Sequence, residues 1–413
     1  MKKVKSICCL CILLFVFGLT CAQSLKEMNK NPRKSFQMPY QIIPENIPNE
    51  GILFVDHEKN SRSGHGGHAV TECLNGDIIA FYMNTWAEQW NGHGCGGWSS
   101  YKRSTDGGKT WSEPVDFKYS LDVWNKYDEV YSAMVFGVIT APDGTLIATV
   151  VRFADANWRK QLPPVYLLSH DNGYTWSDPI EYDEDATVDD ISLTFNTGFV
   201  YNNEVFIILF GGAQSPGVGP YSLYVSKDNG KSFSRRSILP FDHRNYYSAA
   251  AVLDNGHIIV YSYPYPTSGR YANPSLDTDE KNIPYVISKD GGHTWSEVKT
   301  TYFAKAIRNP QMSEKIGDYY FIHGRSGSYG DNPNNFVLYS SKDGINWDEG
   351  VYLVTRQNTP RAGAGDFYSG NATVGKYNSS SSRRLLIQAD ISYNGPRVNI
   401  YHWWVEVPNR TKK

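Results

Sequence analysis

One turn signature occurs five times in this chain, and it constrains the fold more than any other feature. Each copy has a Ser, an Asp two residues later, then a Gly and an aromatic residue. The copies are STDGGKTW at 104–111, SHDNGYTW at 169–176, SKDNGKSF at 226–233, SKDGGHTW at 288–295 and SKDGINW at 341–347. The Asp can bond N–H groups of its own turn, and Gly can adopt the positive φ of a tight hairpin. Successive Asp residues are about 53 to 65 positions apart, a spacing that indicates repeated blades.

The segments between the turns share one order of strands. From residue 51 onward, short β-rich runs alternate with Gly, Asn, Asp and Pro. In the first repeat a strand with small residues (68–74) is followed by a turn at 75–77, an apolar strand (78–84) and a third strand (98–104). A short fourth strand follows each signature. Four antiparallel strands per repeat are typical of a propeller blade.

The last repeat lacks the signature but supplies a sixth blade. Three strands without it follow the fifth copy, at 371–377, 383–390 and 398–407. The early strand GILFVDH at 51–57 could complete this sheet and close the ring. We therefore predict an all-β, six-bladed β-propeller of four-stranded antiparallel blades, with seven blades as the alternative.

The first residues have the pattern of an export signal. Three lysines precede an apolar run at 7–19, and small residues follow it. This pattern predicts a signal peptide over residues 1–22, and the run is too short for a membrane span. Cys21 is an alternative lipoprotein acceptor, although residues 18–20 fit that motif poorly. We expect a periplasmic or secreted protein.

The remaining chain is predicted to form an extended lead-in over 23–50 and one catalytic propeller domain over 51–413. Cys73 and Cys95 are the two cysteines beyond the leader, and they could form a disulfide after export or remain buried thiols. The net charge is −2 and the globular part has no basic cluster, which argues against a nucleic-acid partner. The sequence does not indicate the oligomeric state.

The five turns resemble those of Asp-box (BNR-repeat) propellers, the superfamily that includes the sialidases. The resemblance implies an active site at one mouth of the axial channel, lined by the innermost strands and their loops. A sialidase would need three arginines for the substrate carboxylate, an Asp acid, and a Tyr activated by a Glu. Because fold does not fix activity, each of these groups must be found in the sequence.

The sialidase groups are missing from the positions where the resemblance would place them. The first arginine would fall at 64–69, which reads GHGGHA. The acid Asp would fall near His93, the Glu near 246–248, and a later arginine at 334–335, which reads NN. The scaffold is therefore retained without the visible sialidase chemistry.

Histidines, tyrosines and arginines occupy these positions instead. We predict His65, His68, His93, Tyr246 and Tyr247 as the catalytic group. Adjacent strand residues face opposite sides, so only one of the two tyrosines is expected to face the channel. The predicted substrate-binding residues are Tyr131, Arg152, Arg244, Arg308, His323, Arg325 and Tyr368.

This combination suits β-elimination next to a uronate carboxylate. The proton at C5 is weakly acidic, so a cation must neutralise the carboxylate before a Tyr or His removes that proton. A second Tyr or His then protonates the group leaving C4. The chain resembles propellers that process ulvan-like uronate–rhamnose glycans, which implies a lyase or a dehydratase acting on acidic oligosaccharides. We expect no cofactor; a metal site at His65, His68, His93 and Cys95 is the weaker alternative.

Two other functions remain open. A glycoside hydrolase, sialidase-like or otherwise, would draw its carboxylates from Asp122, Asp128, Glu129 or Asp366, but these form no evident opposed pair. A non-catalytic glycan-binding propeller would bind sugar and release no product.

Overall fold

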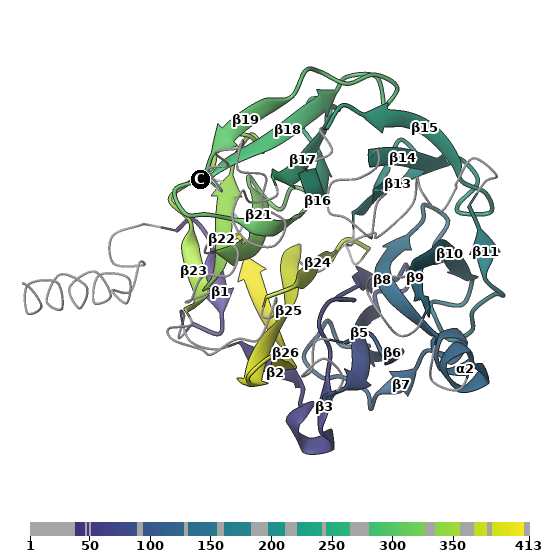
Figure 1. Cartoon of the computed structure of the whole chain (residues 1–413). Helices are drawn as coiled ribbons and strands as arrows, with labels where there is room; N and C mark the ends of the chain where they lie inside the picture. Colours follow the sequence, from purple (N-terminus) through teal and green to yellow (C-terminus); the bar gives the residue numbers. More distant parts are fainter. Residues whose placement is uncertain are drawn as a thin grey trace, which may run out of the picture.

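Six antiparallel sheets surround a central axis in the order in which they occur along the chain (Figure 1). The computed structural model describes residues 38–45, 48, 51–88, 94–127, 131–154, 161–182, 197–210, 221–241, 245–264, 281–326, 335–355, 367–377 and 382–408. The prediction of an all-β propeller with six blades is confirmed, and the alternative of seven is wrong. No helix among these residues is long and apolar enough to cross a membrane.

The first three blades run from β3 to β15. Blade one contains β3 (Arg62–Ser63), β4 (Val70–Glu72), β5 (Ile78–Trp86), β6 (Gly97–Ser104) and β7 (Val115–Asp116). Blade two contains β8 (Ser132–Thr140), β9 (Leu146–Phe153), β10 (Gln161–Ser169) and β11 (Ile180–Glu181). Blade three contains β12 (Gly198–Tyr201), β13 (Glu204–Phe210), β14 (Tyr221–Ser226) and β15 (Ser234–Leu239). Two short helices lie beside blade one, η2 (Glu58–Asn60) and α2 (Lys118–Lys126).

The last three blades run from β16 to the end of the chain. Blade four contains β16 (Asn245–Val252), β17 (Ile258–Pro264), β18 (Asn282–Ser288) and β19 (Lys299–Tyr302). Blade five contains β20 (Arg308–Met312), β21 (Tyr320–Ser326), β22 (Asn335–Ser341) and β23 (Val351–Thr355). Blade six contains β24 (Ser369–Val374), β25 (Arg384–Asn394) and β26 (Arg397–Glu406), with β1 (Gln41–Ile43) and β2 (Ile52–Val55).

The N-terminal strands close the ring. Both β1 and β2 pair antiparallel with β26, with Ile42 opposite Val405 and Ile52 opposite His402. The segment GILFVDH, which was expected to complete the sixth sheet, thus joins that sheet as β2. The segment 23–50 was expected to be an extended lead-in, but its residues 41–43 form a strand of blade six.

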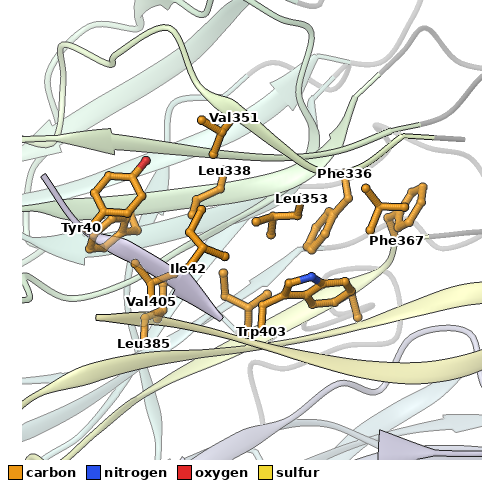
Figure 2. Packing of buried hydrophobic residues seen from close by; sticks show 14 of the residues in the cluster. Tyr40, Ile42, Phe336, Leu338, Val351, Leu353, Phe367, Leu385, Trp403 and Val405 are labelled. Atoms are coloured by element: carbon orange, nitrogen blue, oxygen red, sulfur yellow. The ribbon is translucent and has the colours of Figure 1, made fainter. Parts of the chain in front are cut away.

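Apolar residues fill the space between neighbouring blades. Figure 2 shows the cluster between blades five and six, where Phe336 and Phe367 stack with ring centroids 5.6 Å apart. Ile42 of β1 packs into the same cluster next to Leu338. Burial of such side chains is the main favourable term in folding, so this cluster fixes the N-terminal strand onto the last blade.

The five signature turns form one repeated hydrogen-bond network. In the fourth copy, Ser288 Oγ accepts the N–H of Gly292 (2.8 Å) and donates to Asp290 Oδ1 (2.8 Å). Asp290 also accepts bonds from the N–H and hydroxyl of Thr294 (2.9 and 2.6 Å). In the first copy Gly108 has a φ of +86° and a Cβ there would meet the Trp404 ring at 2.3 Å, so only glycine fits.

The signature aspartates should make the fold sensitive to acid. Hydrogen bonds from Thr294 and Ser288 lower the pKa of Asp290, and similar bonds lower the pKa of Asp106. Since an unfolded Asp has a pKa of about 3.9, the stabilisation is complete above that value and is lost as the pH falls through the lower folded value. We expect the free energy of unfolding to fall between pH about 5 and about 2.

Urea unfolding at several pH values measures this effect. Asp290→Asn should lower stability at neutral pH and make it less dependent on pH. Asp178→Asn removes the same charge just outside the second copy and serves as the control. An Asp290→Asn profile parallel to that of the unaltered protein would contradict the assignment.

The two cysteines do not form a disulfide. Cys73 and Cys95 are free and fully buried, so the second of the two expectations, a pair of buried thiols, is confirmed. Burial raises the pKa of the Cys73 thiol to about 12 and also raises that of Cys95. Both behave as small apolar core residues.

Candidate functional site

The innermost strand of blade one is split in two, and the gap contains two of the predicted catalytic histidines. Strands β3 and β4 both pair with β5, and residues 64–69 between them leave the sheet. Gly67 has a φ of +62°, and a Cβ there would lie 3.0 Å from the Val135 carbonyl oxygen of blade two. The glycines therefore let His65 and His68 pass close to the neighbouring blade.

Both histidines face one buried carboxylate, that of Asp390 in β25. His65 Nδ1 and His68 Nε2 each lie 3.4 Å from Asp390 Oδ2, and all three side chains are almost fully buried. Burial by itself would raise the pKa of Asp390, but hydrogen bonds and electrostatic attraction from the two histidines outweigh it and lower the pKa. His65 Nε2 also bonds the Pro396 carbonyl oxygen. The carboxylate is therefore held in its charged form inside the protein.

A second chain of bonds sets the tautomer of His68. Gln388 Nε2 donates to the Phe81 carbonyl oxygen (2.7 Å), and Gln388 Oε1 lies 2.9 Å from His402 Nε2. The other hydrogen of the amide then points to His68 Nδ1 at 3.2 Å, which must accept it. His68 consequently carries its hydrogen on Nε2 and directs it to Asp390. Both ring nitrogens are engaged, so His68 positions Asp390.

Asp390 in turn positions Tyr368 at the start of blade six. Its Oδ1 accepts the Tyr368 N–H (3.1 Å), and its own N–H donates to the Tyr368 carbonyl (3.3 Å). The Tyr368 ring lies 6.4 Å from the His65 ring of blade one and 6.4 Å from the Tyr247 ring of blade four. A ring that contacts residues of both these blades from blade six lies near the axis.

Tyr247 reaches the same place through an irregular backbone. The pairing of β16 with β17 shifts register between Tyr246 and Ser248, and Tyr247 has a φ of +51°. Its ring packs 6.4 Å from that of Tyr263 and turns toward Tyr368. Left-handed non-glycine residues cluster at functional sites, where the surrounding structure holds them in place.

Two arginines of blade five complete this group. Arg308 of β20 and Arg325 of β21 are directly opposite one another in register, and each is only 3% exposed. Opposite residues of an antiparallel pair project from the same face of the sheet. The Arg325 guanidinium carbon lies 5.0 Å from the centre of the Tyr368 ring. The buried Arg325 cation therefore lies next to the Tyr368 ring, with Arg308 opposite it in the sheet.

These residues define what we call the upper mouth, the end of the channel where the innermost strands of blades four to six begin. It comprises Tyr247, Arg308, Asn309, Arg325 and Tyr368. A small cavity of about 10 Å³ lies there, enough for about one water molecule. Its lining residues come from blades one, two, five and six: Gly66, Gly67, His68, Phe136, Asn309, Gln311, Tyr368 and Ser369.

Of the other predicted site residues, His323 lies behind the lining of this cavity, and Arg152 lies elsewhere. His323 is fully buried, bonds Ser369 Oγ (3.1 Å) and Asn371 Nδ2 (2.9 Å), and has a pKa lowered to about 3 by burial. Arg152 bonds the Pro163 carbonyl oxygen on the outer side of blade two (2.7 Å).

Tyr131 stacks near Tyr127 before β8, with ring centroids 4.9 Å apart. His93 and Arg244 lie outside the described residues, as does the side chain of Tyr246. The structure therefore brings together His65, His68, Tyr247, Tyr368 and the arginines of blade five.

A larger cavity opens at the opposite end of the axis. It has a volume of about 330 Å³ and lies where β4, β8, β16 and β24 end. The Glu72 carboxylate there accepts the N–H groups of Gly375 (2.9 Å) and Lys376 (2.7 Å), and Lys376 pairs with Glu314 at 3.3 Å. Lys315 also pairs with Asp254 there, and none of the predicted site residues lines this cavity.

The described residues of the site include two arginines and no cluster of metal ligands. Within the described ranges, no three His, Cys, Asp or Glu side chains are arranged to hold a metal ion. Cys95 does not join the histidines but lies in the core cluster with Met83 and Met134. The upper mouth instead offers two guanidinium groups and two phenols, which can bind a carboxylate and transfer protons.

Comparison with known proteins supports the fold. Residues 102–113 match the family model of the BNR/Asp-box repeat. A protein of unknown function from Dyadobacter fermentans DSM 18053 is 14% identical, with a TM-score of 0.62 over 88% of this chain and 100% of that one. The Hadza microbial sialidase Hz136 is 14% identical, with a TM-score of 0.62 over 85% and 68% of the two chains.

An α-L-arabinanase from Penicillium chrysogenum is 13% identical, with a TM-score of 0.55 over 87% of this chain and 98% of that one. No curated protein matches the sequence. At these identities the likeness concerns the fold alone. The repeat and the sheet order identify the chain as a six-bladed Asp-box β-propeller whose structural neighbours include sialidases and an arabinanase.

Proposed function

We propose that the protein is a carbohydrate-active enzyme that acts at the upper mouth on uronate-bearing oligosaccharides by β-elimination. The observation that carries this proposal is the buried Arg325 guanidinium over the Tyr368 ring, with Tyr247 on another side of that ring. A cation next to two phenols supplies the charge and the proton-transfer groups that elimination requires.

The arginines would bind the carboxylate of the sugar. Arg308 and Arg325 are buried and project from the same face of blade five, so both guanidinium groups could reach one carboxylate. A carboxylate there would form charge-assisted hydrogen bonds with them. Its neutralisation would also stabilise the negative charge that develops at C5 during proton removal.

The two phenols would then transfer the protons. One, as phenolate, takes the proton from C5, and the C5–H electron pair forms the C4=C5 double bond. The bond between C4 and its oxygen breaks, and the second phenol gives that oxygen a proton. A sugar as leaving group makes the reaction a lyase reaction, and water makes it a dehydration. His65, His68 and Asp390 contribute by holding the backbone of Tyr368.

A glycoside hydrolase is the second candidate, favoured by the sialidase and arabinanase that share this fold. Most hydrolases need two opposed carboxylates, although sialidases use a Tyr nucleophile. Asp390 is engaged by two histidines, and Asp122 pairs with Lys118 on the exposed face of α2. Asp128, Glu129 and Asp366 lie outside the described residues. We favour elimination because a buried guanidinium and two phenols lie together at the upper mouth.

One assay separates the candidates. The purified protein is incubated with glucuronate–rhamnose oligosaccharides while the ultraviolet absorbance of an unsaturated uronate and the product masses are followed. Absorbance with chain cleavage identifies a lyase, and absorbance with loss of one water identifies a dehydratase. New reducing ends without absorbance would reject elimination in favour of hydrolysis, and binding without any product would reject catalysis.

We also propose that the chain is exported, so that it meets such glycans in the periplasm or outside the cell. The proposal rests on the pattern of residues 1–22. Mass determination of the protein recovered from the periplasm and the medium would establish whether these residues are removed.

A further inference from the structure

We infer that Asn309 is a further substrate-contacting residue, whose side-chain amide donates a hydrogen bond to an uncharged oxygen of the sugar. The inference rests on the proposed function and adds a residue to it. Asn309 follows Arg308 near the start of β20 and lines the axial cavity.

The backbone of Asn309 is shaped for this position. Asn309 follows Arg308 in β20, where pairing with β21 shifts register between Arg308 and Gln311. Its φ of +49° lies in the left-handed region, which Asn tolerates better than most residues. The irregularity interrupts the ladder and places Asn309 among the residues that line the axial cavity. Tyr247 and Phe367, with φ of +51° and +71°, begin the innermost strands of the adjacent blades in the same way.

The side-chain amide of Asn309 has an unused hydrogen-bond donor among the described residues. Asn309 is only 5% exposed, yet its Nδ2 has no hydrogen-bond partner in the part of the chain that the structure describes. A buried amide donor without an acceptor is unfavourable, and such groups in native proteins usually have a partner. Asn309 lines the cavity at the upper mouth, which has room for about one oxygen-sized group, so a sugar oxygen that reaches into it would be the partner of the amide.

The chemistry of the neighbouring arginines indicates which kind of ligand oxygen the Asn309 amide would bind. Arg308 and Arg325 present guanidinium groups, which match a carboxylate in charge and geometry. The Asn309 amide is a neutral donor, which suits a hydroxyl or ring oxygen of the same sugar. Asn309 would therefore orient the sugar ring after the arginines have taken its carboxylate.

Replacement by glycine tests this without disturbing the backbone. Glycine adopts the same left-handed φ at no steric cost, so Asn309→Gly removes the amide and keeps the conformation. Asn203→Gly is the matched control, since Asn203 has a φ of +62° in the exposed turn between β12 and β13. We expect Asn309→Gly to weaken binding of a glucuronate–rhamnose oligosaccharide and lower kcat/KM by about tenfold, and Asn203→Gly to change neither.

A second variant guards against a structural explanation. Asn309→Asp has the same shape but no N–H donor, so it should bind the oligosaccharide at least as weakly as Asn309→Gly, while its carboxylate beside the arginines should leave the melting temperature unchanged or higher. Binding by calorimetry, kcat/KM and thermal unfolding are measured for all variants. Unchanged binding and kcat/KM in Asn309→Gly or Asn309→Asp, with an active unaltered protein, would overturn this inference alone. Failure of the unaltered protein to bind or convert the oligosaccharide would overturn the proposed function and this inference together.

Discussion

Replacing Tyr368 by Phe is expected to lower kcat on a uronate oligosaccharide by about 10² to 10⁴-fold, the usual contribution of a positioned acid or base. The substitution removes the hydroxyl and keeps the ring. The contact with the Arg325 guanidinium at 5.0 Å and the backbone bonds to Asp390 should therefore persist. KM should change little, because the ring and both arginines remain in place.

The measurement is steady-state kinetics by ultraviolet absorbance, with thermal unfolding as a check on the fold. Tyr174→Phe is the control, since Tyr174 is 63% exposed in the second signature turn. Tyr247→Phe should also lower kcat if the two phenols divide the roles of acid and base. A Tyr368→Phe protein that retains most of its kcat would remove Tyr368 from the chemistry.

The fold could be predicted because its main signal is local. Each signature turn closes its network within seven or eight residues, as Ser288, Asp290 and Gly292 show, so five copies revealed five blades directly. For the closure of the ring, the sequence predicted strand β2 but not strand β1. Strand β1 has three residues, too few to show a period, and its pairing of Ile42 with Val405 joins the two ends of the chain.

The site was predicted less well, because its contacts are distant in sequence. Asp390 is a single carboxylate in an apolar strand, and its partner His68 is 322 residues away. Local patterns indicated that His65 and His68 were unusual, but not that they face a buried acid. Regular alternation also left open which of Tyr246 and Tyr247 faces the channel, and the register shift between Tyr246 and Ser248 shows that this strand does not alternate regularly there.

Replacing Arg325 by Met should cost about 10² to 10³-fold in kcat/KM on a uronate substrate, the effect of losing one preorganised charge-stabilising group. The loss should depend on the substrate's carboxylate. On the carboxyl-reduced oligosaccharide, which has glucose in place of glucuronate, the variant and the unaltered protein should bind equally well. Arg325→Lys keeps the charge without the planar fork and should give an intermediate value.

The stability of the same variant separates a binding role from a structural one. Arg325 is a buried cation, and its replacement by an apolar side chain removes the cost of burying that charge, so the melting temperature should be unchanged or higher. Arg236→Met is the matched control, because Arg236 also lies over an aromatic ring (Phe206, 5.2 Å) but pairs with Glu204 at 2.7 Å on an outer strand. This control should lower stability and leave kcat/KM intact. If Arg325→Met instead destabilises the protein and binds both oligosaccharides equally poorly, the guanidinium supports the fold, and the uronate carboxylate needs another partner.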